Sequence, residues 1–269
     1  MTTQRKDIGL EQFYTKQERV EELTTLIASR INPSEIIEPS AGDGVWFHQG
    51  NLSIDYAYDL EPKHPAVIEQ DFLSLDLPYK AGRLFIGNPP FGRRASLAIK
   101  FINKCASAGD YIAFILPASF GKQSIMNQVD KSFHLVYQQE LFDEEFRTTD
   151  GTKKVKTLFQ LWERRTTKRE PLVKKSSCSD FSFVVDRTKA DIAITTHGVS
   201  FGKVYENNFS HLSHTTNRFI ISKIEKATLV DRLRTLDLKP FARFTTGAPC
   251  VSQTELIELY LLNHLTTQR

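Results

Sequence analysis

The sequence predicts an α/β fold built on a mostly parallel sheet, closed by an antiparallel pair of strands and followed by a small α+β appendage. Short β-rich runs alternate with helical patterns over residues 1–163, which is typical of a parallel sheet with helices on its faces. Two further β-rich runs end this region and indicate the antiparallel pair. A cluster of basic residues around Pro171 then marks a change in composition.

The parallel part of the sheet is predicted from five short runs, each bounded by polar, Gly or Pro residues. These candidate strands are 35–38, 54–58, 66–69, 84–87 and 111–116. An amphipathic helix is expected before them over 15–31, and a second helix over 95–108 leads into the last of them.

The antiparallel pair is expected at 134–139 and 157–163, separated by a polar insert whose turn is Asp150-Gly151. This pair closes the sheet. We therefore expect the first domain to span residues 1–163.

A basic linker is expected over 164–179, followed by a small domain over 180–269. The expected elements of this domain are strands at 180–185 and 190–195, a helical stretch at 218–236 and a last helix. Ser252, followed three residues later by Glu255 and then by an apolar run, forms a capping box that predicts the start of this last helix.

Composition excludes several classes of protein. No apolar run approaches the roughly 18 residues of a membrane span, and the N-terminus is too polar for a signal peptide. A soluble, cytoplasmic protein is expected. The three cysteines, Cys105, Cys178 and Cys250, are too far apart in sequence to suggest a zinc site or a disulfide framework.

Charge is distributed unevenly along the chain. Residues 1–163 hold 18 Lys and Arg against 22 Asp and Glu, whereas residues 164–269 hold 17 against 10. The net charges are −4 and +7. A surface that binds a polyanion is therefore expected in the C-terminal part.

A glycine turn follows the first predicted strand, which ends at Glu38. The turn consists of Pro39, Ser40, Ala41, Gly42, Asp43 and Gly44, and an apolar helical stretch follows it. Glycines let the backbone approach a ligand closely, and the N–H groups at a helix start favour a polar or anionic group. Taken alone, the segment is equally consistent with an ordinary tight turn.

Acidic residues stand at the ends of the next two predicted strands. Asp59, followed by Leu60, is placed to accept both hydroxyls of a ribose. Asp71 is placed to accept from an adenine amino group while Phe72 packs on the ring. Open α/β sheets bind ligands at this edge, so the sequence predicts a cofactor that contains a nucleoside. A nicotinamide or flavin enzyme is the rival, but the turn lacks GxGxxG.

The fourth predicted strand ends in Asn88-Pro89-Pro90-Phe91, the most specific signal in the sequence. Prolines lock the turn and donate no hydrogen bond, so nearby carbonyls stay free to accept. The Asn88 side-chain oxygen and the Pro89 carbonyl can each accept one hydrogen of an amino group, and Phe91 offers a face for a flat base. The alternative is a rigid loop without chemistry.

These features together resemble the class I S-adenosylmethionine-dependent methyltransferases, over roughly the first 163 residues. The resemblance implies a Rossmann-like fold, S-adenosyl-L-methionine as the cofactor and no metal. The first motif of that superfamily corresponds to residues 38–44, its ribose acid to Asp59 and its adenine contact to Asp71 and Phe72. The tetrapeptide that begins at Asn88 is similar to the catalytic motif of amino-group methyltransferases acting on adenine N6, guanine N2 or the glutamine side chain.

Two further segments are similar to the adenine-N6 DNA methyltransferases of gamma motif order, in which target recognition is C-terminal. Phe13, Tyr14 and Thr15 resemble their N-terminal cofactor motif, although Lys16 stands where proline is frequent. The alternative is two aromatics that staple the helix start. Residues 155–159 resemble a later motif whose aromatic packs on the extruded base, which would be Phe159. An aromatic in a closing strand is otherwise a core residue.

Cations that could line a path for phosphates follow the tetrapeptide and the last strand. These are Arg93, Arg94, Arg164, Arg165, Lys168 and Arg169. Their alternative is an ordinary solvated surface.

The leading hypothesis is an N6-adenine DNA methyltransferase with nucleic acid as its partner. The alternatives are an RNA base methyltransferase acting on adenine N6 or guanine N2, a protein glutamine N5-methyltransferase, and an inactive methyltransferase fold that only binds nucleic acid.

Overall fold

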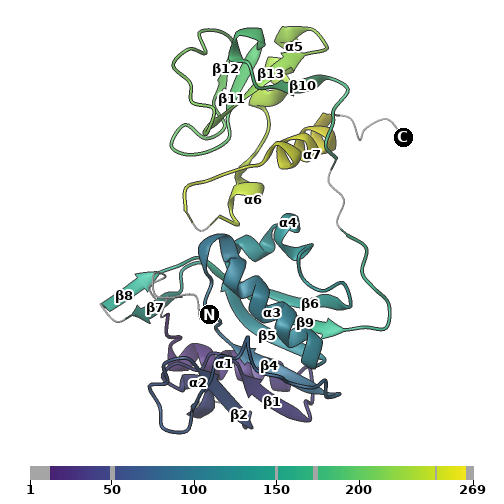
Figure 1. Cartoon of the computed structure of the whole chain (residues 1–269). Helices are drawn as coiled ribbons and strands as arrows, with labels where there is room; N and C mark the ends of the chain where they lie inside the picture. The colour runs from purple at the N-terminus through teal and green to yellow at the C-terminus, as the bar shows by residue number, and fades with distance from the viewer. Residues whose placement is uncertain (1–12, 49–51, 149–150, 172–174, 246, 265–269) are drawn as a thin grey trace, which may run out of the picture. The chain divides into compact units, whose positions relative to one another are not determined.

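The computed structural model describes residues 13–48, 52–148, 151–171, 175–245 and 247–264, which form two compact units, Met1–Pro171 and Leu172–Arg269. Each unit has its own sheet (Figure 1). The helices of the first unit are α1 (Gln17–Ala28), α2 (Val45–His48), α3 (Ser96–Ala108) and α4 (Gln123–Met126), with single 3-10 turns at η1 (Arg93–Ala95) and η2 (Ala118–Gly121). Its strands are β1 (Glu35–Glu38), β2 (Tyr56–Asp59), β3 (Ile68–Glu69), β4 (Arg83–Gly87), β5 (Tyr111–Pro117), β6 (Phe133–Leu141), β7 (Glu145–Thr148), β8 (Gly151–Lys154) and β9 (Thr157–Arg164).

Seven of these strands form one sheet in the order β3-β2-β1-β4-β5-β9-β6. Neighbours from β3 to β5 are parallel, and β9 is antiparallel to both β5 and β6. This is a mostly parallel, Rossmann-like sheet closed by an antiparallel pair, so the predicted fold class is confirmed. Strand order reverses between β1 and β4, which makes the carboxyl ends of these two strands the topological switch point.

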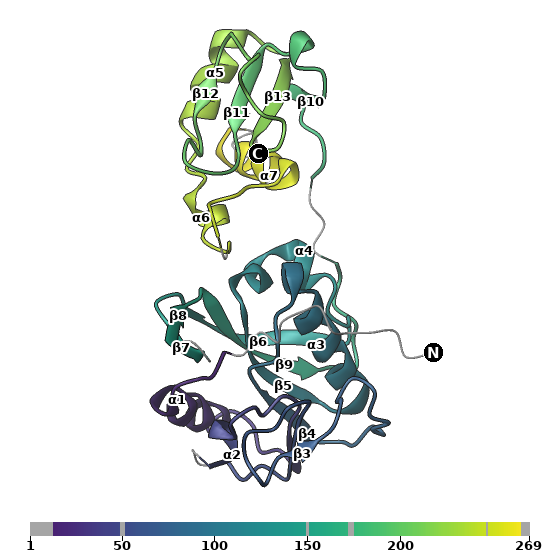
Figure 2. The ribbon, with the colours of Figure 1, turned by 60° about the vertical axis from the view of Figure 1, so that its left-hand side comes forward.

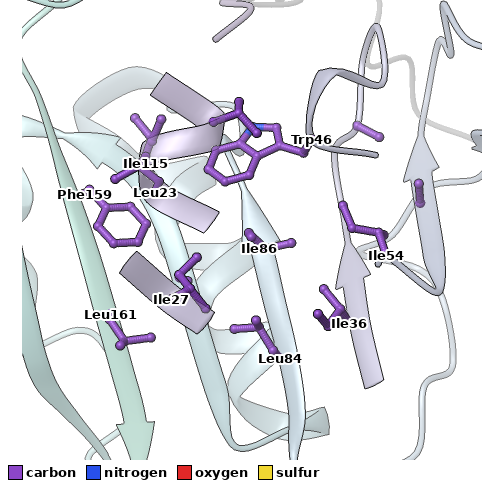
Figure 3. Close-up of a cluster of buried hydrophobic side chains, with 14 of the residues drawn as sticks. Leu23, Ile27, Ile36, Trp46, Ile54, Leu84, Ile86, Ile115, Phe159 and Leu161 are labelled. Carbon is purple, nitrogen blue, oxygen red and sulfur yellow. The ribbon is translucent and has the colours of Figure 1, made fainter. Parts of the chain in front are cut away.

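Helix α1 covers one face of this sheet because Val20, Leu23 and Ile27 recur at helical spacing. They pack with alternate residues of the central strands, such as Leu84 and Ile86, in the cluster of Figure 3. Phe85 points to the opposite face, where the aromatic rings of Phe72 and α3 residue Phe101 lie. The sheet is thus covered by apolar side chains on both faces, so polar side chains that could bind a ligand lie at the ends of its strands.

The second unit is an antiparallel sheet of four strands in the order β10-β13-β11-β12, visible with its helices in Figure 2. Its elements are β10 (Phe181–Val184), η3 (Arg187–Lys189), β11 (Ile192–Thr195), β12 (Val204–Tyr205), β13 (Asn217–Ser222), α5 (Lys226–Arg234), α6 (Lys239–Ala242) and α7 (Gln253–His264). The capping box is confirmed, since the Ser252 N–H donates to the Glu255 carboxylate (2.8 Å) and the Glu255 N–H donates to the Ser252 hydroxyl (3.2 Å).

The helical stretch predicted over 218–236 is wrong in its first part. Residues 217–222 form β13, the strand that pairs with both β10 and β11, and α5 begins only at Lys226. An aromatic and two β-branched residues in a row, Phe219, Ile220 and Ile221, favour a strand buried on both faces. Periodicity alone does not separate such a run from a buried helix.

Buried polar groups of the second unit satisfy one another. The Tyr260 hydroxyl and an Arg232 N–H both donate to the Asp180 carboxylate at 2.7 Å. Burial raises the pKa of Tyr260 to about 12, so this tyrosine stays neutral and remains a donor. Among the described residues, no helix is long and apolar enough to cross a bilayer, and no group of His, Cys, Asp and Glu is arranged to hold a metal ion.

Candidate active site

The carboxyl ends of β1 and β4 bring Glu38 and Asn88 to the switch point of the sheet. In the register of the two strands, Ile37 lies opposite Phe85. A Cβ on Gly87, which has φ +135°, would lie only 3.3 Å from Glu38 Cγ, so Glu38 packs directly against the residue before Asn88. The two sequence-predicted motifs therefore meet at one edge.

The Asn88 side chain is held in a defined orientation. Its Nδ2 donates to the Phe13 carbonyl at 2.8 Å and lies 3.5 Å from the Thr15 hydroxyl. Its Oδ1 is buried and has no hydrogen-bond partner. Rotating the amide by half a turn would set this oxygen against the Phe13 carbonyl, so the free group must be the acceptor. A buried acceptor without a partner costs about 1–3 kcal/mol.

Three aromatic rings pack together around Phe13, the residue that accepts from Asn88. The rings of Phe13 and Phe91 are stacked, with centroids 5.9 Å apart, and Phe13 meets Phe146 edge-on at 6.1 Å. Phe91 and Pro89 are buried, and Pro90 is half-buried. Residues 13–15 thus help to build the Asn88 site, beyond the cofactor role that the sequence predicts for them.

The glycine turn lies between β1 and α2 and has a backbone that other residues rarely adopt. Gly42 and Gly44 have φ of +54° and +77°. A Cβ on Gly42 would stand 3.0 Å from the Tyr14 ring, so this tyrosine lies directly over the turn. Ser40, before the glycines, has a buried hydroxyl with no partner.

Three acidic side chains surround this turn. Burial, together with the nearby charges of Asp43 and Asp59, raises the pKa of Glu38 well above its usual range. One Glu38 oxygen, Oε2, has no hydrogen-bond partner. Asp59 accepts backbone N–H groups on both oxygens, from Gly42 and Glu61 at 2.8 Å each. The edge of the sheet is therefore electronegative, which favours a cationic ligand.

The two residues predicted to contact adenine, Asp71 and Phe72, lie in different environments. Asp71 caps its own loop by accepting the Leu73 N–H at 3.0 Å. Phe72 is 1% exposed and stacks on Phe101, which gives it a core position and leaves its ring little surface for a ligand. Leu60, by contrast, is 49% exposed beside Asp59.

A residue that the sequence did not single out joins the turn to the β7-β8 hairpin. Arg147 exchanges two backbone hydrogen bonds with Tyr14, at 2.9 and 3.1 Å. Its guanidinium pairs with Asp43 at 2.7 Å. With Glu61 and Lys63, these residues line an open cavity of about 800 Å³. The one local signal is the alternation of charged and apolar residues around Phe146, which indicates a strand but not its partner.

The cations predicted to bind phosphates fall into two groups. Arg164 donates to the carbonyls of Ala106 and Gly109 and pairs with Asp110. Arg169 donates to three carbonyls, those of Met126, Val129 and Phe133, at 2.8 to 2.9 Å. These two arginines hold the first unit together, and residues 164–171 belong to it rather than to a free linker. The remaining predicted cations are exposed: Arg93, Arg94, Arg165 and Lys168.

Arg93 and Arg94 lie in a strained segment directly after the tetrapeptide. Gly92, Arg94 and Ala95 have φ of +66°, +54° and +62°, a region that non-glycine residues rarely adopt. Such outliers cluster at functional sites. The segment turns both arginine side chains toward solvent at the start of α3.

Phe159 lies in β9 between Ile115 of β5 and Gln139 of β6. Its side chain is 0% exposed and belongs to the core cluster of Figure 3. A ring enclosed in this way has no face for an extruded base, so we do not propose the stacking role for it.

No protein-family model matches the chain, and no curated protein matches its sequence. Among solved structures, a protein of Pyrococcus horikoshii assigned as an RNA methyltransferase is 15% identical, with a TM-score of 0.45 over 59% of this chain and 90% of that one. The 23S rRNA methyltransferase ErmE is 14% identical, with a TM-score of 0.39 over 61% of this chain and 73% of that one. At identities of 15% or less and TM-scores below 0.5, neither structure assigns an activity or a substrate to this chain.

Proposed function

We propose that this chain transfers a methyl group from S-adenosylmethionine to an exocyclic amino nitrogen, namely N6 of adenine in DNA. The observation that carries the proposal is the Asn88 amide, whose nitrogen is engaged by Phe13 while its oxygen is buried and unpartnered. A ligand with an amino group would give this oxygen a partner.

The residues at the sheet edge fit a cationic cofactor. S-adenosylmethionine supplies an electrophilic methyl group on a positively charged sulfur. Glu38, Asp43 and Asp59 favour that charge, whereas they would repel the pyrophosphate of a dinucleotide. Asp59 lies at the end of β2, where a carboxylate can accept ribose hydroxyls, and the Glu38 Oε2 and Ser40 Oγ are buried atoms that lack partners.

The amino group is oriented by two acceptors. Asn88 Oδ1 and the Pro89 carbonyl each accept one N–H, which directs the nitrogen lone pair toward the methyl group for in-line displacement. With S-adenosylmethionine bound, the carbon–nitrogen bond would form as the carbon–sulfur bond breaks, and the extra proton on nitrogen would then leave to solvent. Since that proton is lost after alkylation, no general base is needed. Stacked Phe13 and Phe91 offer an apolar wall for a flat base.

A nucleic acid substrate is favoured over protein glutamine by the exposed cations near the site, Arg93 and Arg94 among them. RNA carries the same amino groups and phosphates, so an RNA base is the second candidate. DNA is the substrate that the gamma-like order of the motifs favours.

The proposal is tested by offering the purified protein labelled S-adenosylmethionine with duplex DNA, with RNA and with a glutamine-containing release-factor-type protein. We expect label in DNA and N6-methyladenine after nucleoside digestion. Label in RNA alone would replace the DNA assignment with the RNA one. Label in the protein alone would exclude a nucleic acid substrate, and no transfer to any of the three would contradict the enzyme assignment.

A further inference from the structure

The β7-β8 hairpin is an insertion between β6 and β9 that stands off the end of the sheet in both views (Figures 1 and 2). Its second strand, Gly151–Lys154, is exposed at every residue. Lys153, Lys154 and the following Lys156 are all exposed, and we call them the hairpin lysines. The first unit as a whole carries no excess of positive charge, so this local row requires an explanation.

Nearby acids do not neutralise the hairpin lysines. Glu144 pairs with Arg19 at 2.9 Å and Glu145 pairs with Lys16 at 3.3 Å, both from the start of the chain. Within the described residues, no carboxylate lies within 4 Å of a hairpin lysine, although Lys154 acts electrostatically on Glu145. Their ammonium groups are therefore available to an external anion.

Lys153 lies on the face of the hairpin that is turned toward the Asn88 site. It pairs directly with Phe146 across the two strands, and directly paired residues share a face. The Lys153 ammonium is 5.5 Å from the centre of the Phe13 ring. Phe13 in turn stacks on Phe91 and accepts from Asn88. Phe13 thus contacts both this cation, through its ring, and the Asn88 side chain, through its carbonyl.

Lys156 extends the row along the same edge of the sheet. Its carbonyl accepts the N–H of Ala118, directly after the carboxyl end of β5, and β5 is the parallel neighbour of β4. Its ammonium lies 5.7 Å from the Phe142 ring centre. The hairpin lysines therefore follow the sheet edge on which Asn88 stands.

We propose that the hairpin lysines bind the phosphodiester backbone next to the target nucleotide. The inference rests on the proposed function, because it names nucleic acid as the substrate of the Asn88 site. A base that enters this site must leave its stack, and its own backbone then passes close to the pocket. Cations there neutralise phosphates and release counterions, which strengthens binding without sequence preference.

The test compares K153Q/K154Q/K156Q with the parent in salt titrations of binding to labelled duplex DNA and to labelled single-stranded RNA of equal length. We expect the log–log slope to fall by about 2 to 3 on duplex DNA and by about 2 on the single strand, as three contacts at roughly 0.9 or 0.7 each require. When each loss is divided by the value per contact for its polymer, the polymer with the larger number of lost contacts is the source of the phosphates. Thermal melting checks that the variants fold.

Two control variants make the result specific. K100Q/K104Q/K131Q removes the same charge from α3 and from the segment before β6 and should keep the parental slope. K153R/K154R/K156R keeps the positive charge and should therefore also keep the parental slope. The inference is overturned if the parent binds and methylates a polymer while the hairpin variant retains its slope, or if the control variant loses as much. If the parent protein binds neither polymer, both this inference and the proposed nucleic acid substrate are wrong. The methyl-transfer assay of the parent protein distinguishes that outcome from a failure of the hairpin lysines alone.

Discussion

The two units differ in how many of their buried polar side-chain atoms lack a hydrogen-bond partner. Among the described residues, the first unit holds five buried side-chain atoms without a hydrogen-bond partner and the second holds one. Three of those five belong to Glu38, Ser40 and Asn88, which lie at the ends of β1 and β4 or within two residues of them. The second unit instead satisfies Asp180 twice, through Tyr260 and Arg232. Unpaired groups persist where a ligand can supply the missing partner, which locates the proposed chemistry in the first unit.

Charge separates the units less than the sequence suggests. Divided at the structural boundary, residues 1–171 hold 22 basic against 23 acidic side chains, and residues 172–269 hold 13 against 9. The net charges become −1 and +4. Because Arg164 and Arg169 bind backbone carbonyls of the first unit, the position of individual cations is a better guide to nucleic acid contacts than the net charge of a region.

The largest effect is expected from replacing Asn88, whose buried oxygen lacks a partner in the first unit. Asn88→Ala should lower kcat by at least about 100-fold, as removal of an oriented polar group in a buried site does, while S-adenosylmethionine binds almost normally. Asn103→Ala is the matched control, since its side chain bonds only to Gln128 and Asp130 in the described structure. Retained turnover in Asn88→Ala, measured by methyl transfer, would remove the catalytic assignment.

The second test concerns the ribose acid. Asp59→Ala should weaken cofactor binding by about 1.5–3 kcal/mol, the range for hydrogen bonds to a charged group, and it also frees the Gly42 N–H. Asp55→Ala, which loses a bond to the Ile36 N–H at the opposite edge of the sheet, should leave the affinity unchanged. Calorimetry that finds equal affinity in Asp59→Ala and the parent would refute the ribose role.

A smaller effect is expected at Glu38, and it depends on pH. The folded pKa is raised above the ordinary 4.5, so the folded protein binds more protons than the unfolded chain and stability falls as pH rises above that value. Glu38→Gln removes this loss. The variant without ligand should melt higher than the parent at neutral pH, with a difference that shrinks toward pH 4.5.

Glu38→Gln also reports on the cofactor. If a cationic ligand charges Glu38, cofactor binding by the parent releases a proton, and the calorimetric enthalpy at neutral pH depends on the buffer. The variant should bind more weakly and lose this dependence. An unchanged affinity would assign Glu38 to the fold alone.

The smallest effect is expected from the exposed cations after β9. R165Q/K168Q should lower the salt slope of nucleic acid binding by at most about 1.8 on duplex DNA, less than the hairpin variant, and should leave cofactor affinity intact. A slope equal to that of the parent would make these two side chains an ordinary solvated surface. Arg164 and Arg169 are left unchanged because their loss would destabilise the unit.

Local pattern predicts most of the fold and points to the centre of the candidate site. The strand at Glu35–Glu38 and the turn at Asn88 can both be predicted, because strand periodicity and turn chemistry act over a few residues. The roles of Arg147 and Arg169 depend on partners distant in sequence, which no local pattern encodes. Phe159 is aromatic, as the motif suggests. Whether its ring is exposed, however, depends on which face of β9 the core covers, and the core covers Phe159.

The contacts of residues 13–15 also bear on when the chain gains its site during synthesis. Asn88 is oriented by a carbonyl 75 residues earlier, and Asp43 is paired with Arg147 from 104 residues later. Non-local contacts form late in folding because their loops must close first. A nascent chain that has not yet made β7 already carries the glycine turn and the tetrapeptide, but lacks the strand that holds Tyr14 over them. Translation that stops before the hairpin would therefore leave a chain with every motif and an unfinished site.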